Sequence, residues 1–256
     1  MRVSEEKKLT DNFEKCQKLR KIKFLIFHHI EAEDINSAID LLNENKVSAH
    51  YIIDVNGDVY NLVSDCDIAF HAGYSNFRGI ESINKVSIGI ELLNHNVAEN
   101  EFPFTQLDSL LELSKKLIQK YNINQKNILG HSDIAYYPES TKYKDQIGFL
   151  DRKQDPSHLF NWKYMAQNGV SIFPEVGIKI DDKTLFSHGD VDSEIVRVKA
   201  DLKRYGYKVT NSGQHFDIEM KNLCRVFNRR YNPHKFNSDP DSWWLSSDEI
   251  LKSLIV

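Results

Sequence analysis

The chain has 256 residues, of which 41% are hydrophobic and 27% charged, a composition typical of a folded globular protein rather than a disordered one. Its 33 Lys and Arg residues against 37 Asp and Glu residues give a formal net charge of -4, so we expect no nucleic-acid partner. Its apolar runs fall short of the ~20 residues that span a bilayer, so we expect no transmembrane segment.

Residues 1–22 are polar and rich in Lys and Glu, which predicts a short surface helix or a mobile lead. They lack the apolar stretch of a secretory signal peptide, so we expect a cytoplasmic location. The three cysteines are far apart and include no Cys-x-x-Cys pair. They are therefore expected to be isolated thiols rather than a disulfide framework or a cysteine zinc site: Cys16, Cys66, Cys224.

The next part of the chain predicts a strand, a helix and a hairpin, in that order. Residues 23–29 are rich in aromatic and β-branched side chains and form the first expected core strand. Hydrophobic residues then recur at helical spacing over 35–45. Residues 50–55 and 58–62 flank Asn56-Gly57, a dipeptide that favours the type I′ turn of a β-hairpin.

Three further elements are expected before the middle of the chain ends. Residues 86–92 alternate between apolar and small or polar side chains, which predicts a strand with one buried face. Thr105 is the expected cap of a helix that continues to Tyr121, and residues 128–131 predict a short strand. Residues 136–151 show no regular period and predict a long loop, a kind of segment that often has a function.

The composition shifts near Pro174, and the remaining sequence has the spacing of three short helices. They are expected in the segments SEIVRVKADLKRYGYKV, FDIEMKNLCRVFNRRYN and SSDEILKSLIV, with Gly206 as a helix C-cap. We therefore expect a lead over 1–22, a first domain over 23–176 and a small helical domain over 177–256.

Four polar residues lie in the predicted core strands or after them. His28 and His131 lie at strand ends, Glu91 lies within a strand, and Asp155 follows the last strand. Two histidines and one carboxylate with an open fourth position are a common catalytic zinc set, and a neighbouring glutamate can serve as its general base. Each signal alone is weak, because a histidine at a strand end is more often an ordinary core or surface residue. An Asp-Pro pair is usually a turn, so spacing alone does not establish a metal site.

Several motifs together support a more specific interpretation. The segments LIFHHIEA, VSAHYIID, AFHAG, NKVSIGIELLN, ILGHSDIA and RKQDPS occur in this order. In combination they resemble the zinc-dependent N-acetylmuramoyl-L-alanine amidases of the AmpD and AmiD type, which share the peptidoglycan-recognition-protein fold. The resemblance covers residues 22–176. The later segments LKRYGY and CRVFNRRY are similar to the three-helix peptidoglycan-binding module of AmiD-like members.

This resemblance implies an α/β fold with a mixed central β-sheet flanked by helices. It also implies one zinc ion per chain, bound by His28, His131 and Asp155, with Glu91 as the catalytic proton carrier. Lys153 would stabilise the negative charge that builds on the substrate carbonyl oxygen. The implied reaction is hydrolysis of the amide between the lactyl group of N-acetylmuramic acid and L-alanine. Its substrate is peptidoglycan or muropeptides, including 1,6-anhydro forms.

Five further residues lie in segments that line the substrate groove of the family: Tyr51, His71, Arg78, Asn84 and Asn94. The Arg78 guanidinium suits a carboxylate of the stem peptide. For each of the five, a purely structural role is about as plausible as substrate binding. His29, His50 and His71 are not expected to bind the metal.

The sequence departs from the family in two places. Residues 136–151 form an insertion that separates two expected ligands, and Ser157 replaces the usual glycine after Asp-Pro. The alternative functions are a non-catalytic peptidoglycan-binding or sensing protein and a zinc peptidase that cuts within the stem peptide. The alternative to a cytoplasmic location is a periplasmic or wall-associated one, reached by another export route. The helical module favours this alternative. The oligomeric state is left open.

Overall fold

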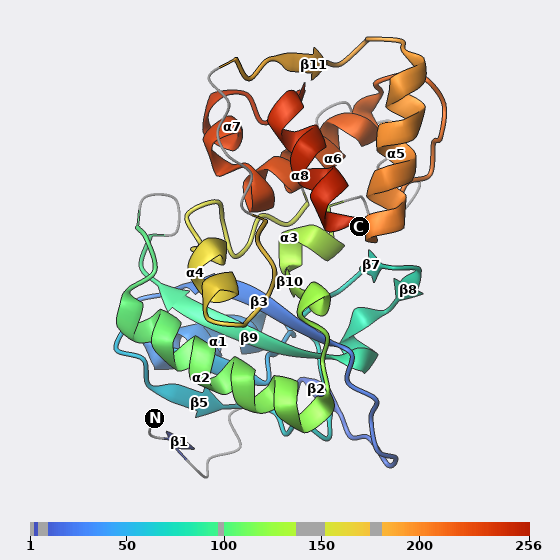
Figure 1. The fold of residues 1–256 in the computed structure, drawn as a ribbon. Coiled ribbons are helices and arrows are strands. Elements are labelled where there is room, and N and C mark those ends of the chain that lie inside the picture. The colour runs from blue at the N-terminus through green and yellow to red at the C-terminus, as the bar shows by residue number, and fades with distance from the viewer. Residues whose placement is uncertain (1–2, 5–9, 97–99, 137–151, 175–180) are drawn as a thin grey trace. The chain divides into compact units, whose positions relative to one another are not determined.

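The computed structural model describes residues 3–4, 10–96, 100–136, 152–174 and 181–256 (Figure 1). Their contacts divide the chain into two compact units. The first comprises Met1–Gly73, Ser82–His131 and Asp155–Ile172, and the second comprises Tyr74–Glu81, Ser132–Gln154 and Phe173–Val256. Most of the expected insertion, residues 137–151, and the expected domain boundary at 176 lie outside the described residues.

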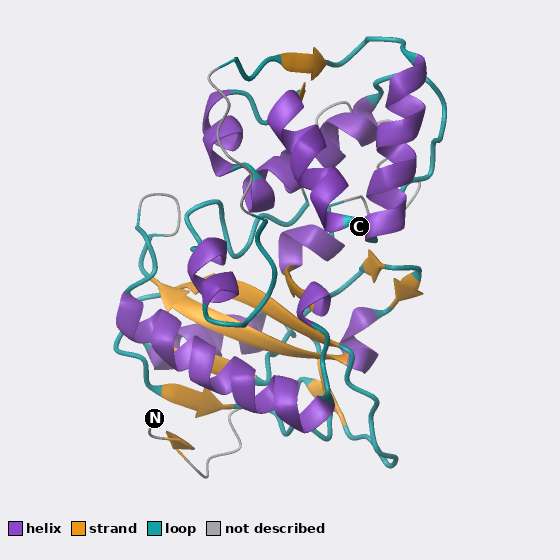
Figure 2. Cartoon of the chain, viewed as in Figure 1, coloured by secondary structure: helices purple, strands orange, loops and turns teal. Residues whose placement is uncertain are grey.

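Among the described residues of the first unit, six strands form a mixed sheet in the order β1-β5-β4-β9-β3-β10. Strands are orange and helices purple in Figure 2. β3 pairs in parallel with β9 and β10, whereas β4 is parallel to β9 and antiparallel to β5. Their bounds are β1 (Val3–Ser4), β3 (Phe24–Glu31), β4 (Tyr51–Ile53), β5 (Val59–Asn61), β9 (Ser87–Asn94) and β10 (Ile128–Gly130). The mixed sheet with flanking helices confirms the expected fold class, and β4 and β5 form the expected hairpin around Asn56-Gly57.

β9 is buried along its whole length, so the expectation of one buried face was wrong. The strand lies between β3 and β4 and pairs in parallel with both. Parallel strands inside a sheet are usually covered by other elements on both faces. The small and polar residues that alternate along it therefore lie on a second buried face and not in solvent.

Two helices cover opposite faces of this sheet (Figure 1). α1 (Ile35–Glu44) begins with a capping box at Asp34 and packs its apolar residues against Ile30, Ile52 and Leu93. α2 (Phe104–Tyr121) has Pro103 at its N-cap, so the expectation that Thr105 caps it was wrong. Because the helix begins before Thr105, that hydroxyl lies in the first turn and donates to the Val55 carbonyl at 3.1 Å.

Shorter elements complete the first unit and its links. They are β2 (Phe13–Glu14), β6 (Ile68–Ala69), the 3-10 helices η1 (Ile83–Val86) and η2 (Gln125–Asn127), and the helices α3 (His131–Ile134) and α4 (Trp162–Gln167). The described part of the N-terminal segment contains two short strands, β1 and β2, where a surface helix or a mobile lead was expected. β2 pairs antiparallel with β6, which ties this segment to the first unit.

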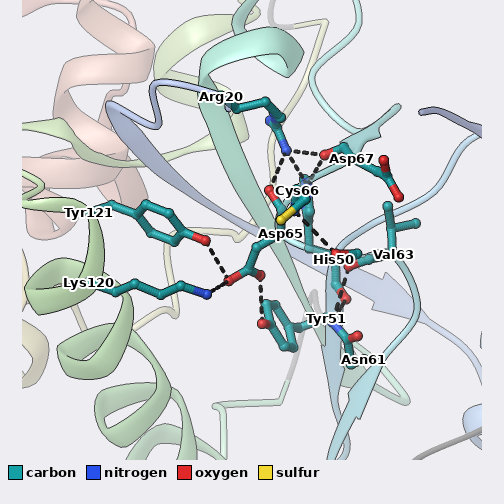
Figure 3. Close-up of polar contacts among 11 residues, drawn as sticks. Arg20, His50, Tyr51, Asn61, Val63, Asp65, Cys66, Asp67, Lys120 and Tyr121 are labelled. Atoms are coloured by element: carbon teal, nitrogen blue, oxygen red, sulfur yellow. Dashed lines mark hydrogen bonds and ion pairs between the residues drawn. The ribbon is translucent and has the colours of Figure 1, made fainter. Parts of the chain in front are cut away.

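Arg20, at the end of this N-terminal segment, is buried and joins several loops (Figure 3). Its guanidinium donates to the carbonyl oxygens of Asp65, Asp67, Asn84 and Ser87. Burial lowers the pKa of Arg20, although the nearby acidic groups oppose that effect. The arrangement uses the planar fork of arginine, whose five donors can satisfy several acceptors at once.

The second unit contains the expected C-terminal helices, α5 (Ser193–Tyr205), α6 (Ile218–Tyr231) and α8 (Leu245–Leu254). α8 packs against both α5 and α6, and Gly206 ends α5 as expected. A short helix, α7 (Pro233–Ser238), and several short strands were not expected: β7 (Asn76–Phe77), β8 (Ile80–Glu81), β11 (Thr184–Phe186) and β12 (Trp243–Trp244).

The second unit also includes two segments from earlier in the chain, Tyr74–Glu81 and Ser132–Gln154, and two residues of the later segment bond to the C-terminal part of the unit. The buried carboxylate of Asp133 pairs with Arg230 of α6 at 3.0 Å, and the Tyr136 hydroxyl donates to the Lys208 carbonyl at 2.7 Å. All three cysteines are free, as expected. No helix among the described residues has the length and apolar character needed to cross a bilayer.

Candidate metal centre

Three elements of the first unit bring His28, His131 and Asp155 together. His28 lies on β3, His131 directly follows β10, and Asp155 precedes Pro156 in the segment before α4. In the parallel pairing of β3 with β10, Gly130 is the partner of Phe27, so the next residues of the two strands are His131 and His28. The two imidazoles are therefore adjacent although 103 residues separate them in sequence.

The three side chains form a small triangle of possible ligand atoms. His28 Nδ1 lies 3.1 Å from His131 Nδ1, and the Asp155 Oδ2 atom lies 2.9 Å and 3.0 Å from these two nitrogens. Zinc bonds of ~2.0 Å at tetrahedral angles separate the ligand atoms by about 3.3 Å. The triangle thus has the size that a tetrahedral ion requires, and it could hold a metal ion.

Both imidazoles turn Nδ1 toward Asp155 and use Nε2 for a contact with the protein. His28 Nε2 lies 3.0 Å from His71 Nδ1, and His131 Nε2 lies 3.2 Å from the Ala72 carbonyl oxygen. Metal-binding histidines commonly have such a partner on the other ring nitrogen. The donor set and its surroundings therefore fit a bound divalent cation.

The electrostatics of the cluster favour an ionised carboxylate. Burial by itself raises the pKa of Asp155, but the adjacent His131 and His28 outweigh that effect and hold the pKa well below its usual range. Burial also lowers the pKa of His71 far below the ordinary histidine value, and it lowers the pKa of His50 to about 3. A neutral imidazole can act as a metal ligand or a hydrogen-bond acceptor, whereas a protonated one cannot.

Glu91 lies beside this triangle on the neighbouring strand. It is the register partner of His28 in the β3–β9 pairing and of Ile52 in the β4–β9 pairing. Register partners in parallel strands project to the same face, and adjacent strands lie ~4.8 Å apart. The buried Glu91 carboxylate therefore leaves the sheet on the face that bears His28.

Gly130, the last residue of β10, permits the close approach of the aspartate segment. A Cβ atom placed on Gly130 would lie 2.7 Å from Pro156 Cδ and 3.4 Å from the Asp155 carbonyl oxygen. The first of these separations is shorter than real Cβ contacts. A glycine here lets the Asp155-Pro156 segment pack directly against the end of the strand that precedes His131.

Of the residues expected to line a substrate groove, His71 contacts the triangle directly and Asn84 contacts it through His71. His71 contacts His28, and the Asn84 side-chain oxygen accepts from the His71 and Ala72 amides at 3.1 Å and 2.7 Å. Both are thus engaged within the protein, next to the expected ligands.

Tyr51 and Asn94 are not brought to the triangle. Tyr51 pairs in register with Ile90, so its side chain leaves the sheet on the face opposite Glu91. Its hydroxyl donates to the Asp65 carboxylate at 2.7 Å (Figure 3). The buried Asn94 amide holds the turn after β9, because its oxygen accepts from the Asn96 amide at 3.0 Å.

Arg78 and Lys153 belong to the second unit. The Arg78 Nε donates to the Tyr205 carbonyl at 3.2 Å, and the Arg78 backbone amide donates to the Gly206 carbonyl at 2.8 Å. Arg78 is exposed and Lys153 is half-buried. Their roles in substrate binding and catalysis remain predictions.

Ser87 and Ala72 also belong to this region, although neither was expected from the sequence. Ser87 lies on the same face of β9 as Glu91, and its hydroxyl lies 3.0 Å from His71 Nε2. The sequence did contain a signal for Ser87. Small or polar residues occupy alternate positions of β9 at Ser87, Gly89 and Glu91, which places all three on one face of the strand. Ala72 contributes only its carbonyl oxygen, for which the sequence offers no signal.

Comparisons with known proteins place this chain in a known family. The family model described as N-acetylmuramoyl-L-alanine amidase, Amidase_2, matches residues 18–158. The chain is 30% identical over 239 residues to N-acetylmuramoyl-L-alanine amidase AmiD of Escherichia coli (strain K12), covering 87% of this chain and 79% of that protein. It is 40% identical over 121 residues to 1,6-anhydro-N-acetylmuramyl-L-alanine amidase AmpD of Haemophilus influenzae, covering 46% of this chain and 56% of that protein.

A solved structure extends the similarity to the fold of nearly the whole chain. It is the complex of E. coli AmiD with the substrate anhydro-N-acetylmuramic acid-L-Ala-D-gamma-Glu-L-Lys. The TM-score is 0.70 at 28% sequence identity, and the match covers 93% of this chain and 90% of that chain. The similarity therefore includes the C-terminal helices as well as the region that the family model matches.

Proposed function

Since this chain belongs to the N-acetylmuramoyl-L-alanine amidase family, we propose that it is a zinc-dependent hydrolase with His28, His131 and Asp155 as its metal ligands. It cleaves the amide between the lactyl group of N-acetylmuramic acid and the L-alanine of the stem peptide. The observation that carries this proposal is the convergence of two imidazoles and one carboxylate within ligand distance, with Glu91 on the same face of the sheet.

The proposed role of each residue follows from the chemistry of its side chain. His28, His131 and Asp155 would hold the zinc ion, which would supply Lewis-acid chemistry: polarisation of a carbonyl oxygen and activation of water near neutral pH. Glu91 takes a proton from the attacking water and returns it to the alanine nitrogen as the C–N bond breaks. The products are a lactyl carboxylate and a stem peptide with a free amino group. For Lys153 we propose the stabilisation of negative charge on the carbonyl oxygen.

The substrates proposed for this chain are muropeptides, including 1,6-anhydro forms, and larger peptidoglycan fragments. Similarity to AmpD, which is named for the 1,6-anhydro substrate, and to AmiD solved with an anhydro-muramyl peptide supports the first class. For residues 177–256 we propose peptidoglycan binding, which would favour larger fragments. Arg78, with its guanidinium, is proposed to contact a carboxylate of the stem peptide.

Digestion of purified peptidoglycan and of anhydro-muropeptides, with and without a chelator, tests this function. We expect mass spectrometry to detect intact stem peptides that begin at L-alanine, with release abolished by the chelator and restored by zinc. Fragments cut within the stem would indicate a zinc peptidase instead. Binding of zinc and peptidoglycan without any release would indicate a non-catalytic binding protein.

A further inference from the structure

The two histidines of the candidate metal centre both contact one short segment, His71-Ala72, through Nε2. We propose that this segment fixes both ligand histidines in the Nε2–H tautomer, which turns an unprotonated Nδ1 toward the metal. His71 is then a positioning residue for zinc rather than a substrate-binding residue. This inference rests on the proposed zinc site and adds to it a determinant of metal affinity.

Ser87 has a single hydroxyl proton. The Ser87 hydroxyl donates to the Ile83 carbonyl oxygen at 2.7 Å, so that proton is already used. The same oxygen lies 3.0 Å from His71 Nε2 and can only accept in that contact. His71 therefore carries its proton on Nε2.

A neutral imidazole has one N–H group, so the other nitrogen of His71, Nδ1, is an acceptor. It lies 3.0 Å from His28 Nε2, which must donate. His28 then has its proton on Nε2 and a lone pair on Nδ1, the atom that lies 2.9 Å from Asp155 Oδ2. The chain Ser87–His71–His28 thus sets the tautomer of the first ligand.

The second ligand is set by the next residue of the same segment. His131 Nε2 lies 3.2 Å from the Ala72 carbonyl oxygen, and a carbonyl oxygen can only accept. His131 therefore has its proton on Nε2 as well, and its Nδ1 faces Asp155 at 3.0 Å. One segment of two residues accounts for both tautomers.

Two features hold this segment in place. The Asn84 side-chain oxygen accepts from both backbone amides of the segment. The His71 ring also lies directly against Gly89 of β9, where a Cβ atom would come within 2.4 Å of His71 Cγ. Any larger residue at position 89 would displace the ring, so the glycine is part of the arrangement.

Zinc affinity of the full chain, measured by competition with a chromophoric chelator, tests the proposal. His71→Leu removes the acceptor, whereas His71→Asn keeps an acceptor oxygen near the position of Nδ1. We expect His71→Leu to weaken zinc binding by ~10–100-fold, the usual effect of losing such a partner, and His71→Asn to restore most of it. His29→Asn, on the same strand with its side chain on the opposite face, is the matched control and should bind zinc as the wild type does.

Nitrogen-15 NMR of the histidine rings reports the tautomers directly. In the zinc-loaded wild type we expect the Nε2–H form at both His28 and His131, with the Nε2–H form at His71. Equal loss of affinity in the Asn and Leu variants, or the absence of a proton on His28 Nε2 in the zinc-loaded wild type, would overturn the proposal. A wild type that binds no zinc would instead refute the proposed function, so the two failures are distinguishable.

Discussion

His28 and Glu91 are register partners in adjacent parallel strands, so an expected metal ligand and an expected proton carrier project from the same face of one sheet. This relationship depends on backbone pairing rather than on loop conformation. Sites on strands are held more rigidly than sites on loops, which suits a general base that must stay within reach of water. Glu91 is not a member of the triangle formed by His28, His131 and Asp155, so its proposed role can be tested apart from metal binding.

Glu91→Gln should therefore separate metal binding from turnover. The substitution keeps the size of the side chain but removes its capacity to accept a proton. We expect zinc content and affinity to stay near those of the wild type, while kcat falls by ~10²–10⁴-fold, the usual contribution of a general acid–base group. Metal analysis and product release measured on the same preparation check this. Glu31→Gln, at the exposed end of β3, should leave both unchanged, and normal turnover in Glu91→Gln would remove Glu91 from the mechanism.

Gly130→Ala should weaken zinc binding without touching any ligand. The added Cβ would lie 2.7 Å from Pro156 Cδ, so the Asp155-Pro156 segment must move away from the end of β10. Displacement of one ligand by a few tenths of an ångström lowers zinc affinity, which chelator competition measures. Gly213→Ala is the matched control, because a Cβ there meets only the side-chain oxygen of Asn211 at 3.2 Å. Unchanged affinity in Gly130→Ala would show that the segment can relax.

The sequence predicted those parts of the fold that follow from local patterns. The helix over α1, the β4–β5 hairpin and the helices of the second unit each have a hydrophobic period or a turn dipeptide within a few residues. The predictions that were wrong concern features that depend on contacts between segments distant in sequence. Alternation along β9 was correct as a strand pattern, but the pairing with β3 and β4 buried its second face.

The candidate site shows the same division. The ligand residues could be proposed from their motifs, but spacing alone could not establish that residues 103 positions apart touch. The opposite orientation of Tyr51 follows from register, which depends on its partner strands. Arg20 lies in a polar segment without a period, and its burial becomes evident only when its four carbonyl partners are brought together in space.

Asn84→Ala should lower zinc affinity although the Asn84 side-chain oxygen bonds to the amides of His71 and Ala72 and not to His28 or His131. The loss frees the His71 and Ala72 amides, and the segment that orients both imidazoles is then less well fixed. We expect an effect of ~10-fold or more on the zinc dissociation constant. Asn84→Asp keeps an oxygen acceptor at the same place and should retain most of the affinity. If the two variants lose affinity equally, the acceptor oxygen is not what matters.

Asp65→Asn should change the pH dependence of folding stability. Burial raises the pKa of Asp65, but bonds from Tyr51, Lys120 and Tyr121 outweigh it, so the pKa lies below the ordinary value (Figure 3). A lowered folded-state pKa contributes stability above the unfolded value of ~3.9, and that stability is lost as the pH falls through the folded-state pKa. The Lys120 side chain is 58% exposed, so we expect the part-buried bonds from the two tyrosines to provide most of the effect.

Urea unfolding at several pH values measures this contribution. At pH 7 the Asp65→Asn variant should be less stable by roughly 1–3 kcal/mol, the typical result of disturbing a buried hydrogen-bonded carboxylate. The difference from the wild type should shrink as the pH falls below about 4, because the carboxylate of the unfolded wild type then takes up a proton, and it should vanish below the lowered folded-state pKa. Asp58→Asn, at an exposed aspartate, should differ little from the wild type at any pH. A difference that stays constant down to acidic pH would mean that the charge of Asp65 does not stabilise the fold.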